Sequence, residues 1–141
     1  MTTVNLNELE LNEFTAKDDA LQHCHATFPL VGAHGSEKIA TVYVELQPGE
    51  KLGRHTDSAE ELLIVLSGDV EVTVADETSK ASRNTMALVP ELVPHDIKNV
   101  GTETARILGV FGGTNHIVAT FDREWLPTHS KVVDTALLFE A

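Results

Sequence analysis

The sequence predicts an all-β protein whose short strands form an antiparallel sandwich or barrel. Short segments of apolar or alternating apolar and polar residues recur at near-regular spacing, and glycine, proline or other turn-forming residues separate them. The length of 141 residues suits one domain with a sizeable core. The sequence shows no internal repeat and no low-complexity tract.

The clearest strand is expected at residues 38–47, where Ala40, Val42, Val44 and Leu46 would share one face. Residues 69–75 also alternate, which is typical of a strand with one face on the core and the other in water. The polar segment 76–82 is interpreted as a turn. Further strands are expected at residues 61–66, 85–90, 96–100, 104–111 and 116–121.

The strand at 61–66 has two features that lead to specific expectations. Residues 62–66 are continuously apolar, which predicts burial on both faces. Ser67, Gly68 and Asp69 then predict a tight hairpin to the next strand.

The two ends of the chain are expected to be extensions of the barrel at residues 37–121. Residues 1–36 mix helical and strand periods and are expected to pack on the barrel or on a partner. Residues 122–141 are too apolar for a free tail, so we expect them to fold back or to cover a second subunit in a homodimer. The apolar residues of this tail are Trp125, Leu126, Val132, Val133, Leu137, Leu138 and Phe139.

Four side chains of the central segment indicate a metal site. In an extended strand His55 and Asp57 point the same way, about 7 Å apart along the chain. Glu61 begins an apolar strand, where a carboxylate is costly to bury unless it is paired or binds a metal. His95 follows Pro94, which restricts the backbone, and shares a face with the residues two and four positions later. Imidazole and carboxylate ligands together suit a divalent first-row metal.

The same residues carry a resemblance to a protein family. The segment 49–68 resembles the first cupin motif, Gly-x5-His-x-His-x3–4-Glu-x6-Gly, with Asp57 in place of the second histidine. The segment 84–99 resembles the second cupin motif, with Asn84 and Leu92 where glycines are usual. The residues that match the two motifs are Gly49, His55, Glu61, Gly68, Pro90, His95 and Asn99.

The resemblance implies a small single-domain cupin, whose fold is a double-stranded β-helix or jelly-roll barrel with short extensions at both ends. It implies a divalent metal ion (Fe, Mn, Ni or Zn) held by His55, Asp57, Glu61 and His95. The motif spacing selects Glu61 over Glu60, which alternation would send to the opposite face. The resemblance does not select a reaction, because cupins include dioxygenases, isomerases, epimerases, decarboxylases and non-enzymatic binders.

Asp57 has two possible roles. As a ligand it gives the site two nitrogens and two carboxylates. As a non-ligand it leaves His55, Glu61 and His95, a set like that of non-haem iron oxygenases. Asp57 would then be a catalytic base beside the metal or would position a ligand through a hydrogen bond.

Three functions remain open from the sequence. The first is a mononuclear metal-dependent enzyme, an oxygenase or isomerase acting on a small organic molecule. The second is a non-catalytic cupin that binds a sugar or another metabolite, which the substitutions at Asp57, Asn84 and Leu92 favour. The third is a structural dimer or partner module without a metal.

Charge and cysteine content restrict the environment and the partners. The net charge of −12 disfavours nucleic acid and anionic membranes as partners. With one cysteine, no apolar stretch long enough to span a membrane and no signal-peptide pattern, we expect a soluble cytoplasmic protein. His23, Cys24 and His25 could ligate a metal, but we favour one buried cysteine between two ordinary histidines.

Overall fold

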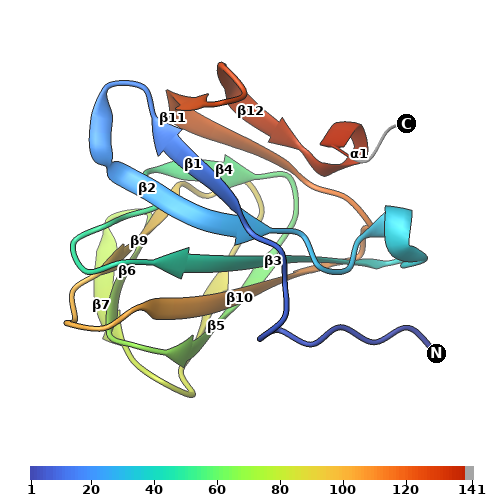
Figure 1. Ribbon diagram of the computed structural model, residues 1–141, viewed down its shortest axis with the longest axis horizontal. Helices are drawn as coiled ribbons and strands as arrows, with labels where there is room; N and C mark the ends of the chain where they lie inside the picture. Colours follow the sequence, from blue (N-terminus) through green and yellow to red (C-terminus); the bar gives the residue numbers. More distant parts are fainter. Residues whose placement is uncertain (139–141) are drawn as a thin grey trace.

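The computed structural model of the chain describes residues 1–138, and its strands form one curled sheet (Figure 1). Phe139, assigned to the apolar tail, lies outside the described residues. The sheet contains β1 (Asn12–Ala16), β2 (Asp19–Thr27), β3 (Ile39–Leu46), β4 (His55–Asp57), β5 (Glu61–Ser67), β6 (Val70–Val74), β7 (Glu77–Ala81), β8 (Met86–Val89), β9 (His95–Asn99), β10 (Ala105–Gly112), β11 (Val118–Leu126) and β12 (Ser130–Asp134). Two short helices, η1 (Gly32–His34) and α1 (Thr135–Leu138), complete the described elements.

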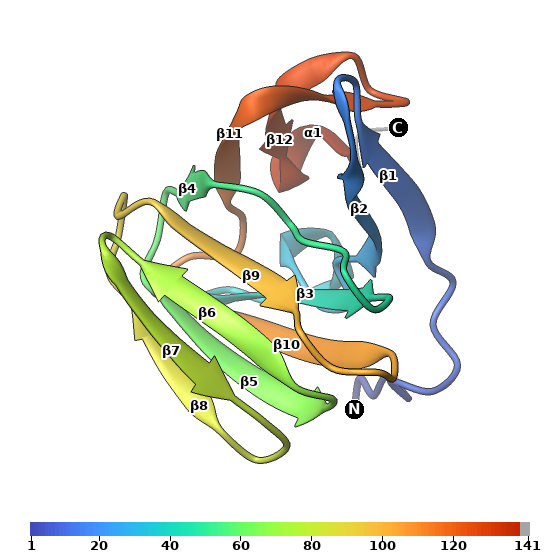
Figure 2. The ribbon, with the colours of Figure 1, turned by 90° about the vertical axis from the view of Figure 1, so that its left-hand side faces the viewer.

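The strands follow the order β7-β6-β9-β4-β11-β1-β2-β3-β10-β5-β8, and β12 pairs with β11. The pairings between these strands are antiparallel, and the sheet curls into a nearly closed barrel (Figure 2). The all-β jelly-roll fold predicted from the sequence is therefore confirmed.

Three local predictions were wrong. Residues 77–81, expected as a turn, form β7, whose exposed polar residues pair with β6 at the edge of the sheet. Such a strand has no apolar face, so its sequence looks like a turn. The hairpin after residue 66 is absent, because β5 pairs with β8 and β10 whereas β6 pairs with β7 and β9.

The third difference concerns β5, which is buried on one face only. Leu63 and Val65 point into the core, whereas Leu62, Ile64 and Leu66 are only half-buried on the outer face. Apolar residues on that outer face explain why the segment looks continuously apolar.

Both ends of the chain contribute strands to the barrel wall. The β1–β2 hairpin lies between β11 and β3 in the sheet. β11 continues beyond the predicted strand as far as Leu126, and β12 folds back along it. Trp125 near the end of β11 is buried in the core.

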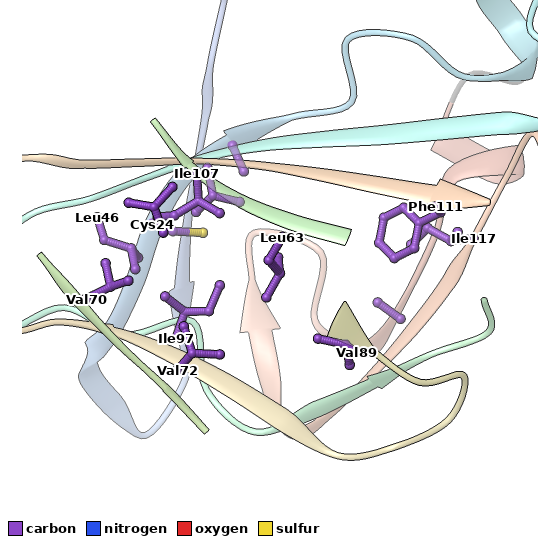
Figure 3. Packing of buried hydrophobic residues seen from close by; sticks show 14 of the residues in the cluster. Cys24, Leu46, Leu63, Val70, Val72, Val89, Ile97, Ile107, Phe111 and Ile117 are labelled. Carbon is purple, nitrogen blue, oxygen red and sulfur yellow. The ribbon is translucent and has the colours of Figure 1, made fainter. Parts of the chain in front are cut away.

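The inward side chains form one apolar core that runs through the barrel (Figure 3). Leu63 from β5, Ile97 from β9 and Ile107 from β10 project into the same interior, with Phe111 and Ile117 farther along. Among the described residues, no helix is long and apolar enough to cross a membrane.

Candidate metal centre and pocket

Strands β4 and β9 bring the two motif histidines together inside the barrel. His55 and His95 are directly paired residues of these antiparallel strands, and their ring centroids lie 4.1 Å apart. Asp57 is two residues along β4 on the same inward face, and Glu61 enters from the start of β5. All four side chains are buried, and Glu60 is exposed, so alternation separates the two glutamates as the sequence predicted.

Backbone carbonyls orient both imidazoles. His55 Nδ1 donates to the carbonyl oxygen of Gly53 at 2.7 Å, and His95 Nδ1 donates to that of Val93 at 2.9 Å. Because a carbonyl oxygen only accepts, each Nδ1 carries its hydrogen, and a neutral ring keeps the lone pair of Nε2 available. Both Nε2 atoms face the carboxylates, and each can ligate a metal ion when it carries no proton.

The distances between donor atoms suit a shared cation. Asp57 Oδ2 lies 3.0 Å from His95 Nε2 and 3.7 Å from His55 Nε2. His55, Asp57 and His95 each offer one ligand atom within 4.8 Å of the others. Glu61 is not in that set of three, but its Oε1 lies 3.4 Å from His95 Nε2. The structure thus brings all four predicted residues to one place, with Glu61 on the side of His95.

The site contains buried polar atoms that lack hydrogen-bond partners. Among the described side chains, these atoms are Asp57 Oδ2, His95 Nε2 and Trp125 Nε1, and all three residues line the same pocket. Asp57 Oδ2 and His95 Nε2 lie 3.0 Å from each other, so a proton on His95 or a metal ion bound by both residues would satisfy these two atoms. The donor set at Asp57 and His95 fits a divalent metal ion.

Burial and charge set the protonation of the site. Burial lowers the pKa of His55 to about 4, so its ring is neutral at pH 7. Burial also disfavours charge on His95, but the carboxylates of Asp57 and Glu61 outweigh it and raise its pKa to about 10. Burial, with the negative charge of Asp57 nearby, raises the pKa of the Glu61 carboxyl. A positive charge among these carboxylates is therefore favoured, whether from a proton or from a metal ion.

Gly109 is a site residue that the sequence reasoning missed. It lies in the middle of β10, and a Cβ there would be 2.1 Å from Glu61 Oε2 and 2.8 Å from Val42 Cγ1. The carboxylate of Glu61 occupies the space that any other side chain would need. An isolated glycine inside a predicted strand is a signal of such a close approach.

The two departures from the motif glycines preserve the backbone conformation. Asn84 and Leu92 have φ angles of 69° and 60°, in the left-handed region that normally favours glycine. The amide of Leu92 donates to the carbonyl oxygen of Asp57 at 3.0 Å, which ties this turn to β4. The loss of the glycines therefore leaves the site geometry intact and no longer favours a degenerate, non-catalytic site.

The pocket above the four polar residues is apolar. Phe121 stacks on the ring of His55 with centroids 4.6 Å apart, and Trp125 packs edge-on against Phe121. None of the described residues that line the pocket is a lysine or an arginine. Besides His55, Asp57, Glu61 and His95, the lining residues are Phe14, Cys24, Ala26, Phe28, Val42, Val44, Leu52, Leu63, Ile97, Ile107, Gly109, Phe111, Ile117, Ala119, Phe121, Trp125 and Val133.

Cys24 belongs to this apolar wall. Burial raises the pKa of its thiol to about 12, and the nearby charge of Glu50 acts in the same direction. The thiolate, which is the reactive form of cysteine, is therefore scarce at neutral pH. Cys24 is a wall residue, whereas the histidines on either side of it point away from the pocket.

Comparison with known proteins gives one family match. The family model described as "Cupin domain" matches residues 42–111, which include β4, β5 and β9 with the four polar residues. A search of the curated proteins found no match to the sequence.

Solved structures with a similar fold differ widely in their described activities. A variant of the Bacillus subtilis oxalate decarboxylase has a TM-score of 0.65 at 21% identity, and the match covers 70% of this chain but only 28% of that chain. The polyketide cyclase RemF from Streptomyces resistomycificus has a TM-score of 0.64 at 19% identity, with 79% of each chain covered. A putative sugar phosphate isomerase from Acidithiobacillus ferrooxidans has a TM-score of 0.65 at 18% identity, with 96% of this chain and 92% of that chain covered.

Gly109→Ala tests the close approach between β10 and Glu61. We expect a loss of about 1–3 kcal/mol in the free energy of unfolding, because the added methyl group must displace a buried carboxylate and Val42. Gly112→Ala, in the same strand, is the matched control, since a Cβ there meets nothing within 4 Å. Urea denaturation measures both variants. Equal, small losses would contradict the close approach.

Proposed function

Because this chain belongs to the cupin family through residues 42–111, we propose that it is a mononuclear metal-dependent enzyme of the oxygenase or isomerase type. Its substrate would be a small organic molecule in the barrel pocket, and its cofactor a divalent ion of iron, manganese, nickel or zinc. The observation that carries the proposal is that His55, Asp57 and His95, all buried in one apolar pocket, each offer a ligand atom within 4.8 Å of the others.

In this proposal His55, Asp57, Glu61 and His95 hold the metal. The two histidines offer Nε2, because their Nδ1 atoms are engaged by backbone carbonyls. Asp57 Oδ2 lies near both histidines, and Glu61 approaches His95. When bound, the ion supplies Lewis acidity toward a carbonyl or enediol oxygen of the substrate and, if it is iron, the capacity for oxygen chemistry.

The chain itself would orient the substrate and move protons. The apolar wall excludes water and packs against the body of the substrate, and Trp125 Nε1 offers it a hydrogen bond. If Asp57 does not ligate the metal, its carboxylate stays available beside the ligands and is the candidate base for proton removal. The stacked ring of Phe121 limits rotation of His55.

The lining of the pocket favours an uncharged, mostly apolar substrate with an oxygen acceptor. A phosphate group held away from the metal would need a cationic side chain, and the described lining has no lysine or arginine. Three solved structures with a similar fold have described activities. Of their substrates, a polyketide would suit the apolar lining of this pocket best.

The alternative is a non-catalytic cupin that binds a small metabolite in the same pocket. The substitution of a motif histidine by Asp57 favours it, because two carboxylates neutralise a divalent ion and make it less electrophilic. This alternative shares the pocket with the enzyme, so turnover of a bound ligand is the property that separates them.

Removing a pocket histidine should remove a metal ion. We expect elemental analysis of untagged protein to show a loss of about one ion per chain in His95→Ala and in His55→Ala relative to the parent. His116→Ala, at an exposed histidine, is the control and should keep the parent content. If the parent, after iron, manganese, nickel and zinc are offered, holds no more metal than His95→Ala and His55→Ala, the proposal is contradicted.

Asp57→Asn separates the two roles of this carboxylate within the same measurement. Loss of an anionic oxygen should weaken metal binding about 10- to 100-fold if Asp57 is a ligand, the role we assign to it. Full retention of the metal would leave His55, Glu61 and His95 as the ligand set and Asp57 as the base.

The pocket should distinguish ligands by charge and by one hydrogen bond. In thermal-shift assays of metal-loaded protein, we expect 1-naphthol to stabilise the fold and glucose 6-phosphate or fructose 6-phosphate to leave it unchanged. Trp125→Phe keeps the apolar wall but removes the N–H, so it should weaken 1-naphthol binding up to about tenfold and leave naphthalene binding unaffected. Stabilisation by the anions alone would contradict the assigned substrate class.

We also propose that the chain forms a homodimer through the outer face of β8, β5 and β10. Met86 and Leu88 on β8 are 62% and 60% exposed, and they stand opposite Ile64 and Leu62 on β5. On the neighbouring strand β10, Leu108 pairs with Ile64 and Val110 pairs with Leu62, so two apolar rows extend across the three strands. Two adjacent apolar rows near an edge of the sheet suit the same face of a second copy, because apolar sheet faces can stack on each other.

Leu88→Glu should shift the protein from dimer to monomer in size-exclusion chromatography with light scattering. The buried negative charges would face each other across the two-fold axis. Leu137→Glu, at an equally exposed leucine on α1, should leave the dimer intact. Dissociation by Leu137→Glu alone would move the interface to the C-terminal tail, and a monomeric parent would contradict the proposal.

A further inference from the structure

The two histidines beside Cys24 form a second candidate site on the outside of the barrel. Alternation along β2 turns Cys24 into the pocket and His23 and His25 to the outer face. The pairing of β1 with β2 places Glu13 opposite His25. Glu13, His23 and His25 each offer a ligand atom within 4.8 Å of the others.

The distances fit one small cation. Glu13 Oε2 lies 3.1 Å from His23 Nε2 and 3.5 Å from His25 Nε2. Two ligands about 2.0–2.1 Å from a tetrahedral zinc ion lie roughly 3.4 Å apart, so the existing separations need little adjustment. The two imidazole rings are nearly perpendicular, with centroids 5.2 Å apart, which directs both toward the same carboxylate without stacking.

Glu50 prepares one of these histidines for ligation. Its carboxylate accepts a hydrogen bond from His23 Nδ1. It also accepts one from the backbone N–H of Gln47, at 2.8 Å. This arrangement fixes the His23 ring and leaves Nε2 facing Glu13. A carboxylate that orients the far nitrogen of a ligating histidine is a recurrent feature of zinc sites.

We propose that Glu13, His23 and His25 bind a second divalent ion of the Zn²⁺ type, separate from the ion in the pocket. The carboxylate of Glu50 is a positioning group in this site. Half-exposed His25 and exposed Glu13 leave room for water as a fourth ligand. The bound ion would join β1 to β2, whose inward residues Phe14 and Cys24 line the pocket, and so would stiffen that wall.

Zinc binding to the full chain in a His95→Ala background tests this site without the pocket centre. By equilibrium dialysis with ⁶⁵Zn²⁺, we expect one ion to remain per chain, and His25→Ala to weaken its binding at least about a hundredfold. Glu13→Gln changes an exposed side chain and cannot disturb the core, so it should cause a similar loss without a change in circular dichroism. His116→Ala is the control for an unrelated surface histidine.

Two further measurements separate ligation from a purely structural ion pair. Co²⁺ bound to the His95→Ala protein should show the intense visible absorption of a tetrahedral complex, and the additional change His25→Ala should abolish it. Glu50→Gln should weaken Zn²⁺ binding about 10- to 100-fold while the stoichiometry stays the same. Unchanged zinc affinity in both His25→Ala and Glu13→Gln would overturn the proposal. This result does not depend on whether the pocket itself binds a metal.

Discussion

The arrangement of the pocket depends on two hydrogen bonds from imidazole rings to backbone carbonyls. By accepting from Nδ1, Gly53 and Val93 turn both Nε2 atoms toward the carboxylates in an otherwise apolar barrel. Desolvation makes unpartnered polar atoms expensive there, so the surrounding wall raises the free energy gained when a cation or ligand arrives. The same barrel that supplies stability through its apolar core therefore also buries the polar side chains that could bind a metal ion.

The fold was predictable wherever a strand has one apolar and one polar face, as in β3 and β6. It was not predictable at β7, whose residues are mostly exposed at the sheet edge and carry no apolar pattern. The β1–β2 hairpin was missed for a different reason. Its register shifts between Thr15 and Ala16, and exposed Leu21 breaks the alternation, so neither the helical nor the strand period dominates.

The grouping of the four candidate ligands was predictable where these residues lie within one strand or close to it. His55, Asp57 and Glu61 follow from local spacing, and His95 follows from a second local motif. Gly109 and Trp125 come from β10 and β11, which carry no motif, and their roles depend on the pairing of these strands with elements distant in the sequence, β10 with β5 and β11 with β4 and β1. For Gly109 the glycine inside an apolar run was a usable signal, whereas Trp125 looked like part of an apolar tail.

Along β2, strand alternation places three consecutive residues in two different environments, the apolar pocket and the outer face of the barrel. Inside, Cys24 is a neutral wall residue with a scarce thiolate, while outside, His23 and His25 meet Glu13. The sequence could not separate these roles, because adjacent Cys and His residues suggest a joint ligand set. The net charge of −12 adds a long-range attraction for cations at both faces of the wall. Discrimination between the two proposed centres would therefore rest on local geometry and burial, because the inner residues are buried whereas Glu13 and His25 of the outer set are partly exposed.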